Sequence, residues 1–311
     1  MGLFDFFKKD KTEFKFNNET LRIAVKKWCK NEFSAIKKYG HISNWDTSLV
    51  TDMSALFLNV YEFNSPIGNW NVSNVTNMEN MFKNAIAFNQ PIGSWDVSNV
   101  TKMNGMFESN VFSFKIALLN NRAFNQSLGL WDVSNVNNME NMFRGAKKFN
   151  QPLGSWDVSN VNNMKDMFAG AEAFNQPIGS WDVSNVTNME GMFFNVNSFN
   201  HSLGSWDVSN VTKMNGMFEC AEAFNQPIGS WNVSNVTNMG SMFNRAGCFN
   251  QSLGSWDVSN VTDMNRMFSR AGSFNQSLRS WDVSKVINME FMFFNDEMIK
   301  LYGRHGENFI R

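Results

Sequence analysis

The 311-residue chain has 27 lysine and arginine residues against 28 aspartate and glutamate residues, a balance that favours neither nucleic acid nor a bilayer surface as partner. It contains no run of about 18 apolar residues, which excludes a membrane-spanning helix of ordinary length. The three cysteines, Cys29, Cys220 and Cys248, are irregularly spaced and fit neither a disulfide framework nor a zinc site.

Residues 1–13 form a predicted N-terminal tail. Within Met1 to Lys9, four apolar residues precede two lysines, a pattern typical of a short peripheral-membrane anchor. The alternative is a tail that is disordered or packs on the protein itself. The same segment lacks a basic stretch followed by an apolar run of signal-peptide length, so the sequence predicts a cytoplasmic location.

Residues 14–40 form a predicted N-terminal cap. Apolar residues recur there at helical spacing, which predicts a capping helix. Such a cap is expected because the outer face of a terminal repeat would otherwise leave the core exposed. The apolar positions are Leu21, Val25, Trp28, Phe33 and Ile36.

Residues 41–295 contain one unit repeated ten times. Successive tryptophans lie 25 residues apart, except that 36 residues separate Trp95 from Trp131. A unit of this length cannot bury its apolar face alone, so the period predicts one elongated solenoid of ten stacked coils. The ten tryptophans are Trp45, Trp70, Trp95, Trp131, Trp156, Trp181, Trp206, Trp231, Trp256 and Trp281.

Each unit predicts two short elements. Around Trp181, apolar and polar residues alternate over W-D-V-S, which predicts a half-buried strand. The following V-T-N-M-E-G-M-F run has apolar residues at helical spacing, and Thr187 with Glu190 matches a capping box, so a short helical turn is expected. The predicted fold is therefore an α/β solenoid with one strand and one helical turn per 25-residue coil.

The I-x-x-W-x-V-x-x-V spacing that begins at Ile178 is similar to that of leucine-rich repeats. From Ile42 to Phe293, the W-D-V-S-N-V-T-N-M-x-x-M-F run resembles the BspA-like leucine-rich-repeat surface-protein family. The resemblance implies a leucine-rich-repeat-like array, a role in surface interaction or adhesion, and a location at the cell surface.

An insertion within 108–123 breaks the period. Its apolar residues must pack back on the array or meet a partner, so it is a candidate partner-binding segment, with a tolerated insert as the alternative. The candidates within it are Phe112, Phe114, Ile116, Leu118 and Leu119. Residues 296–311, where the period fails, form a predicted C-terminal cap.

Differences between units gather in and after the helical turn, which predicts an exposed face. Lys147, Lys148 and Phe194 are candidate partner-binding residues there, although sequence drift explains such differences equally well. Other variable positions include Lys165, Asp166, Glu219, Arg245, Arg266, Arg270, Phe291 and Phe294.

A column of aspartates, one in most coils, is the remaining candidate site. Asp157, Asp182 and Asp207 are candidate calcium ligands, because files of carboxylate oxygens suit that ion. The favoured alternative is that each aspartate accepts backbone N–H bonds within its own turn. Asparagine at Asn71 and Asn232 supports this alternative, because an amide keeps such a bond and weakens an ion site.

Catalysis has no visible candidate, because His41, His201 and His305 lie far apart in sequence and match no catalytic or metal-binding motif. No cofactor is predicted. The predicted function is a non-catalytic scaffold for contact with an unidentified protein. The alternative is a surface adhesin that binds calcium or carbohydrate through its aspartate and tryptophan columns.

Overall fold

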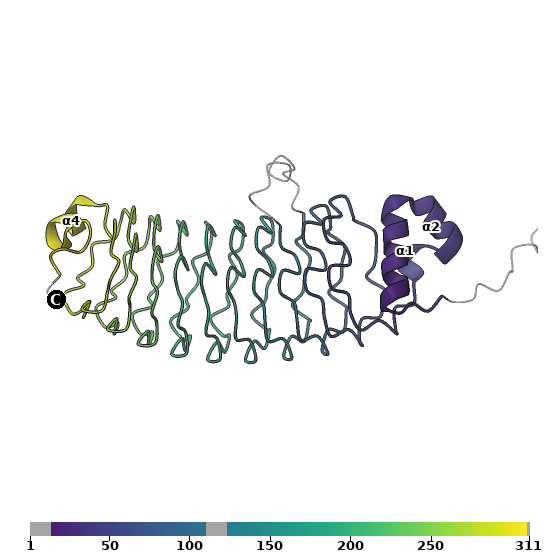
Figure 1. The fold of residues 1–311 in the computed structure, drawn as a ribbon, viewed down its shortest axis with the longest axis horizontal. Coiled ribbons are helices and arrows are strands. Elements are labelled where there is room, and N and C mark those ends of the chain that lie inside the picture. The colour runs from purple at the N-terminus through teal and green to yellow at the C-terminus, as the bar shows by residue number, and fades with distance from the viewer. Residues whose placement is uncertain (1–13, 110–122, 310–311) are drawn as a thin grey trace, which may run out of the picture.

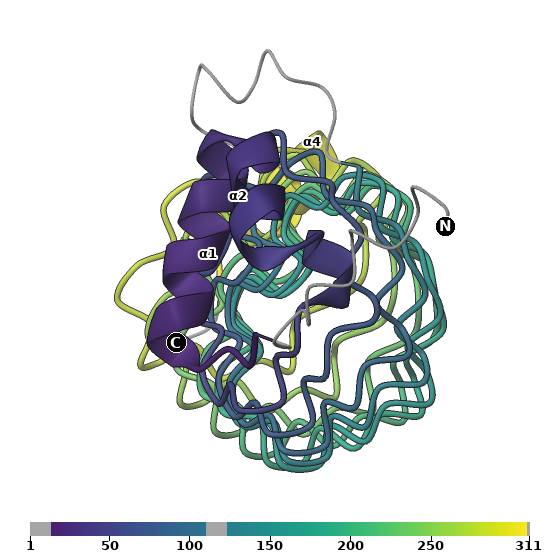
Figure 2. The same ribbon diagram turned by 90° about the vertical axis from the view of Figure 1, so that its right-hand side faces the viewer.

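The computed structural model describes residues 14–109 and 123–309. They form a long, gently curved array of stacked coils (Figure 1). Helices α1 (Asn18–Lys30) and α2 (Glu32–Tyr39) close one end, followed by the short 3-10 helix η2 (Ile42–Asn44), and α4 (Asp296–Tyr302) closes the other. Viewed along the array, the coils lie behind one another in register (Figure 2).

The N-terminal end contains two helices where the sequence suggests one. Asn31 ends α1 and begins α2, because its extended backbone interrupts the helix and its side chain accepts a hydrogen bond from the Ser34 N–H. Leu21 and Trp28 are buried as expected. Phe33, by contrast, is 81% exposed, because the break changes the direction of the chain so that the second helix contributes Ala35 rather than Phe33 to the core.

The interior of the array is one continuous apolar core. Trp181 is 3% exposed and stacks parallel on Trp206, with 6.5 Å between ring centroids. Its indole N–H donates to the carbonyl of Leu153 in the preceding coil at 3.0 Å. From Trp70 to Trp281, each tryptophan of the repeat therefore fills the core and also satisfies its polar atom by bonding to the preceding coil.

The predicted strand over W-D-V-S is wrong. Trp181 and Val183 are buried and Asp182 is exposed, as the alternation suggests. However, the Val186 N–H donates to the Val183 carbonyl within the same coil, so this segment is a turn rather than a strand. Across residues 14–109 and 123–309, pairing between coils is limited to isolated parallel bridges, such as that of Asn188 with its neighbours.

The predicted helical turn after Thr187 is wrong in its backbone. N–H groups bond alternately within the coil and to the next coil: Met192 donates to the Met189 carbonyl, whereas Gly191 and Phe193 donate to the following coil. Gly191 has a φ of 59°, a left-handed conformation that interrupts an α-helix. Met189, Met192 and Phe193 are nonetheless fully buried, because this turn places all three side chains on the inner side of the coil.

The capping box predicted at Thr187 and Glu190 does not form. The Thr187 N–H donates to the Asn162 carbonyl of the preceding coil at 2.9 Å. The Glu190 N–H instead bonds to the side chain of Asn188 at 3.0 Å. Threonine and asparagine columns here join coils and turns rather than begin helices.

Glycine recurs two residues before the tryptophan because adjacent coils approach closely there. A Cβ atom on Gly179 would lie 2.5 Å from the carbonyl oxygen of Ser202 in the next coil. In the last coil this column holds Arg279, and that coil contacts the C-terminal cap rather than another repeat unit. Glycine therefore occurs where the backbone of the next coil leaves little room for a side chain.

The C-terminal end is closed by α4 and the turn after it. Met298 is fully buried, and Phe309 packs against Tyr302 with ring centroids 4.7 Å apart. The Tyr302 hydroxyl accepts a hydrogen bond of 2.8 Å from the backbone N–H of Leu278. This segment therefore covers the last coil and satisfies one of its buried donors.

Candidate functional site

The aspartate column forms turns. Asp157, Asp182 and Asp207 each accept the backbone N–H of the serine two residues later at 3.0 Å. Hydrogen bonds from the serine side chain and backbone lower the pKa of Asp182 and Asp207. Asn232 makes the same backbone contact to Ser234 at 3.2 Å, so a neutral side chain serves equally well.

No group of three or more metal-ligating side chains occurs within residues 14–109 and 123–309. The tryptophans of the repeat are 3–4% exposed in this part of the chain, so their rings offer no face on which a sugar could stack. The aspartate and tryptophan columns are therefore accounted for by the contacts within and between coils.

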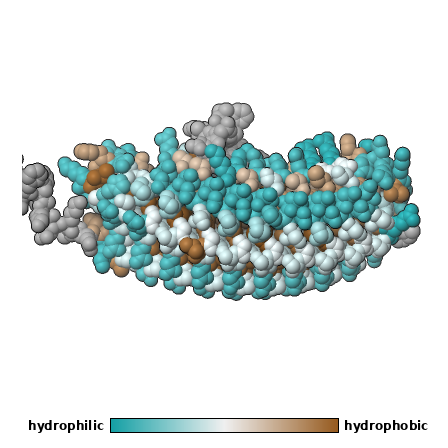
Figure 3. Space-filling view, turned by 180° about the vertical axis from the view of Figure 1, so that it is seen from behind, coloured by the Kyte–Doolittle hydropathy of each residue, from teal (hydrophilic) through white to brown (hydrophobic). Residues whose placement is uncertain are grey.

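Asparagine columns also hold the array together. The Asn175 N–H donates to the side-chain oxygen of Asn150 at 2.9 Å, and Gln176 donates to the same oxygen at 2.9 Å. Asn200 repeats the contact with Asn175 in the next coil. Polar side chains run in rows along the long axis (Figure 3). These constant columns are therefore used in stacking.

We call the variable positions the variable face, defined as the four x residues of M-x-x-M-F-x-x in each coil. Its charges are paired between neighbouring coils through much of the array. Lys83 bonds to Glu108 at 2.8 Å and Arg144 bonds to Asp166 at 3.1 Å. Lys165 bonds to Glu190 at 3.2 Å. In these coils the charged groups of the variable face stabilise one another.

The last coils of the variable face differ, because they form a groove lined by several arginines. The groove has a volume of about 450 Å³. We call it the arginine groove, and its lining residues are Glu219, Asn244, Arg245, Arg266, Ser269, Arg270, Phe291 and Phe294. Most of these residues are variable positions in the sequence, but they come from four successive repeats, so the sequence alone does not group them into a site.

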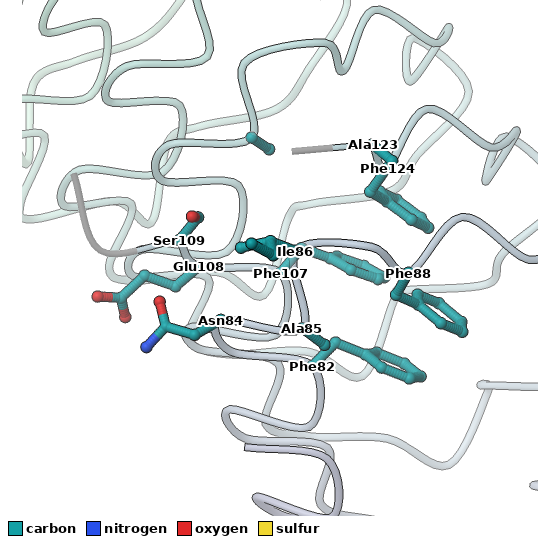
Figure 4. A pocket seen from close by; sticks show the side chains of 11 residues that line it. Phe82, Asn84, Ala85, Ile86, Phe88, Phe107, Glu108, Ser109, Ala123 and Phe124 are labelled. Carbon is teal, nitrogen blue, oxygen red and sulfur yellow. The ribbon is translucent and has the colours of Figure 1, made fainter. Parts of the chain in front are cut away.

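A small cavity lies between the coils that flank the insertion. It measures about 20 Å³, room for about one water molecule. Figure 4 shows phenylalanine rings on one side and the polar ends of Asn84 and Glu108 on the other. The Ser109 hydroxyl is buried and has no hydrogen-bond partner among the described residues. This volume is too small for an organic ligand.

The predicted partner-binding residues fall into two groups. Lys147 and Lys148 are exposed beside the variable face, and Lys147 pairs with Glu172 of the next coil. Phe194 lies on the face and is half-buried. The remaining candidates, Phe112, Phe114, Ile116, Leu118 and Leu119, lie outside the described residues, as does the segment from Met1 to Lys9.

Stacked, in-register coils with a common core define a repeat-solenoid protein, as the 25-residue period predicts. The profile of one family, described as "Mycoplasma protein of unknown function, DUF285", matches residues 27–118, 113–221 and 192–301. The chain belongs to this family. The three tandem matches together cover the whole repeat array, residues 41–295.

The solved structure of a TLR13–ssRNA13 complex aligns with 11% sequence identity and a TM-score of 0.18. The alignment covers 86% of this chain and 53% of that one, so this chain spans about half the length of its neighbour. A search among curated proteins found no match. Within the described residues, no helix is both long and apolar enough to cross a bilayer.

Proposed function

We propose that this protein is a non-catalytic scaffold for protein–protein contact. One observation carries the proposal: side chains that stay constant between units fill the core or join coils, whereas those that differ gather on the variable face. Repeat arrays use such extended surfaces to bind partners, because each coil adds its own side chains to a rigid support.

The contacts between coils support rigidity. Gly191 and Phe193 each donate a 2.9 Å backbone bond to the next coil, and the tryptophans bond to the preceding one. A surface held in this way loses little conformational entropy when a partner binds. The geometry therefore suits recognition by a preformed face.

The resemblance of the W-D-V-S-N-V-T-N-M run to BspA-like surface proteins supports a more specific proposal. In this form the scaffold acts at the cell surface, where contact with another protein amounts to adhesion. Surface labelling of intact cells with a membrane-impermeant reagent tests the location. Labelling only after cell lysis would place the scaffold in the cytoplasm.

The test of the scaffold is a pull-down from native cell extract followed by mass spectrometry. The same pull-down is carried out with two variants of the protein. Deleting residues 110–120 restores the 25-residue step. Phe194→Ala introduces on the variable face the residue that Ala169 supplies one coil earlier, so folding should be retained.

A partner lost with the deletion places binding in the insertion, and a partner lost with Phe194→Ala places it on the variable face. The absence of any reproducible partner for the intact protein contradicts the scaffold. Calorimetry distinguishes the scaffold from the adhesin alternative. A calcium-dependent adhesin should have a lower melting temperature in EDTA, whereas the melting temperature of the proposed scaffold should not change.

A further inference from the structure

We propose that the arginine groove binds an acidic peptide segment of a partner protein, whose carboxylates meet the guanidinium groups of Arg245, Arg266 and Arg270. The inference rests on the proposed scaffold function and names the part of the variable face that does the binding. Three observations carry it: the charges in the groove, the backbone conformation of its residues and the exposed rings beside them.

The arginines of the groove are not neutralised as charges elsewhere on the variable face are. Arg144 and Lys165 each have a carboxylate within 3.2 Å on a neighbouring coil. No salt bridge involves Arg245, Arg266 or Arg270 in the part of the chain that the structure describes, and all three are exposed. The groove therefore offers positive charge to an external anion.

The one carboxylate in the groove is held by an amide rather than by an arginine. Glu219 accepts a hydrogen bond of 2.8 Å from the side chain of Asn244. Burial raises its pKa against the opposing effect of Arg245 and Arg266. The amide engages Glu219 and one donor of Arg245 engages the Cys220 side chain, which leaves the remaining guanidinium donors of the groove for a ligand.

The residues of the groove occupy backbone positions that suit smaller side chains. Arg266 has a φ of 53° and Phe291 a φ of 54°, both in the left-handed region. At the same position of the repeat, earlier coils have Asn141, Gly191 or Gly216. Asparagine and glycine adopt the left-handed conformation more readily than arginine or phenylalanine.

The second left-handed position shows the same change. It holds Gly145 and Gly170 in the middle coils but Arg245 and Arg270, each with a φ of 60°, in the last ones. Bulky residues in this conformation are disfavoured locally and cluster at functional sites. Their gathering in one groove points to selection for binding rather than for stacking.

Two half-exposed rings complete the groove. Phe291 is 41% exposed and Phe294 is 50% exposed. The guanidinium groups of Arg270 and Arg304 lie 5.5 and 5.7 Å from the centre of the Phe294 ring. Such stacking orients the planar guanidinium and leaves its edge free for a bidentate bond to a carboxylate. The rings also provide an apolar contact for a neighbouring side chain.

A peptide fits these features better than a nucleic acid. Polynucleotides are bound along a continuous row of unpaired basic groups, because the phosphate charge is spread along the chain. Here Arg245, Arg266 and Arg270 lie together in one groove rather than in a row along the array, and Lys165 of an earlier coil is paired with Glu190. A volume of about 450 Å³ suits a few side chains.

The test is fluorescence anisotropy with the full chain and a fluorescein-labelled hexapeptide, Glu-Phe-Glu-Glu-Leu-Glu. Saturable binding that weakens with added salt is expected, because unpaired surface charges are screened. The matching peptide with glutamine in place of every glutamate should bind at least about tenfold more weakly, the loss of one charge-assisted contact.

The matched variants use the repeat's own residues. Arg245→Asn and Arg266→Asn place asparagine where Asn84 and Asn141 already adopt the left-handed conformation, so the melting temperature should be retained or rise. Each variant should weaken peptide binding about tenfold. Lys102→Asn removes the same charge at an exposed position that is asparagine in most coils, and it should leave binding unchanged.

Equal binding of the glutamate and glutamine peptides would overturn the inference, as would native affinity in the Arg245→Asn, Arg266→Asn double variant. Tighter binding of a labelled single-stranded oligonucleotide than of the peptide would assign the groove to nucleic acid instead. If the double variant captured a cellular partner as well as the intact protein does, the groove would not be the binding site. The proposed scaffold function would still be supported. Loss of that partner with the double variant, together with peptide binding, supports both.

Discussion

At the scale of single residues, tryptophan stabilises the array through packing and through one hydrogen bond. Trp181→Ala should cost about 3 to 5 kcal/mol of unfolding free energy, because it leaves a core cavity and an unpaired Leu153 carbonyl. Lys147→Ala should cost less than about 0.5 kcal/mol, since its ion pair is exposed. Urea unfolding measures both. Equal, small effects would mean that the inside and outside of the coil are reversed.

The glycine column gives a second, paired prediction. Gly179→Ala forces a Cβ atom to within 2.5 Å of the Ser202 carbonyl, whereas the corresponding distance at Gly254 is 3.6 Å. We expect Gly179→Ala to lower stability by about 1 to 3 kcal/mol, as overpacking does, and Gly254→Ala to be nearly neutral. Thermal unfolding compares the two variants, and a larger loss at Gly254 would contradict the close approach.

Residue burial was the part of the fold most accessible from sequence. The alternation of Trp181 with Asp182 and the spacing of Met189 and Met192 correctly separated inside from outside, because burial follows apolar periodicity whatever the backbone does. The left-handed conformation of Arg266 was not predictable from its type, because arginine rarely adopts it.

At the scale of elements, the aspartate–serine turns couple stability to pH. Hydrogen bonds from serine lower the folded pKa of Asp182 and Asp207, so their contribution is present above the unfolded pKa of about 3.9 and is lost as the pH falls through the folded value. Burial raises the pKa of Asp166, which therefore acts in the opposite direction.

Replacing Asp182 and Asp207 together by asparagine should make stability less dependent on pH below about 4. The asparagine keeps the backbone bond, as Asn232 shows. The reverse change, Asn232→Asp, should make the loss of stability at low pH steeper. Urea unfolding at about pH 5 and about pH 3 measures each slope, and identical slopes in all variants would exclude a role for these turns.

Among the contacts between the C-terminal cap and the last coil is a hydrogen bond to one buried hydroxyl. Tyr302→Phe leaves the Leu278 N–H without its 2.8 Å partner and should cost about 1 to 3 kcal/mol. Tyr61→Phe is the control, since its hydroxyl makes no side-chain hydrogen bond in the described structure. Hydrogen exchange should show faster opening near Leu278 in the first variant alone. Faster exchange in neither variant would show that apolar packing holds the cap without this bond.

The secondary structure was not predictable in detail because turns imitate its patterns. Trp181 and Val183 alternate in burial like residues of a strand, yet a turn closed by Val183 follows them. Met189 and Met192 are spaced as in a helix, yet the N–H of Gly191 bonds to another coil. Sequence periodicity reports the direction of side chains and does not reveal the partner of each backbone group.

At the scale of the whole molecule, the ten-unit period was the strongest signal, because stacking identical units is the common way to bury repeated apolar faces. The candidate site was predicted less well. Lys147 and Phe194 were selected as individual variable residues. The arginine groove arises only when Arg245, Arg266 and Arg270, 25 residues or fewer from one another, stack into one surface.

The same coil-to-coil bonding has a mechanical consequence. Each backbone ladder joins only adjacent coils, as the bond from Gly191 to the next coil illustrates. Tension applied to the two ends therefore loads the terminal interface first, and the chain should peel away one coil at a time. Each step frees 25 residues, or about 85 Å of extended chain, so the array would act as an extensible tether that absorbs work in equal increments.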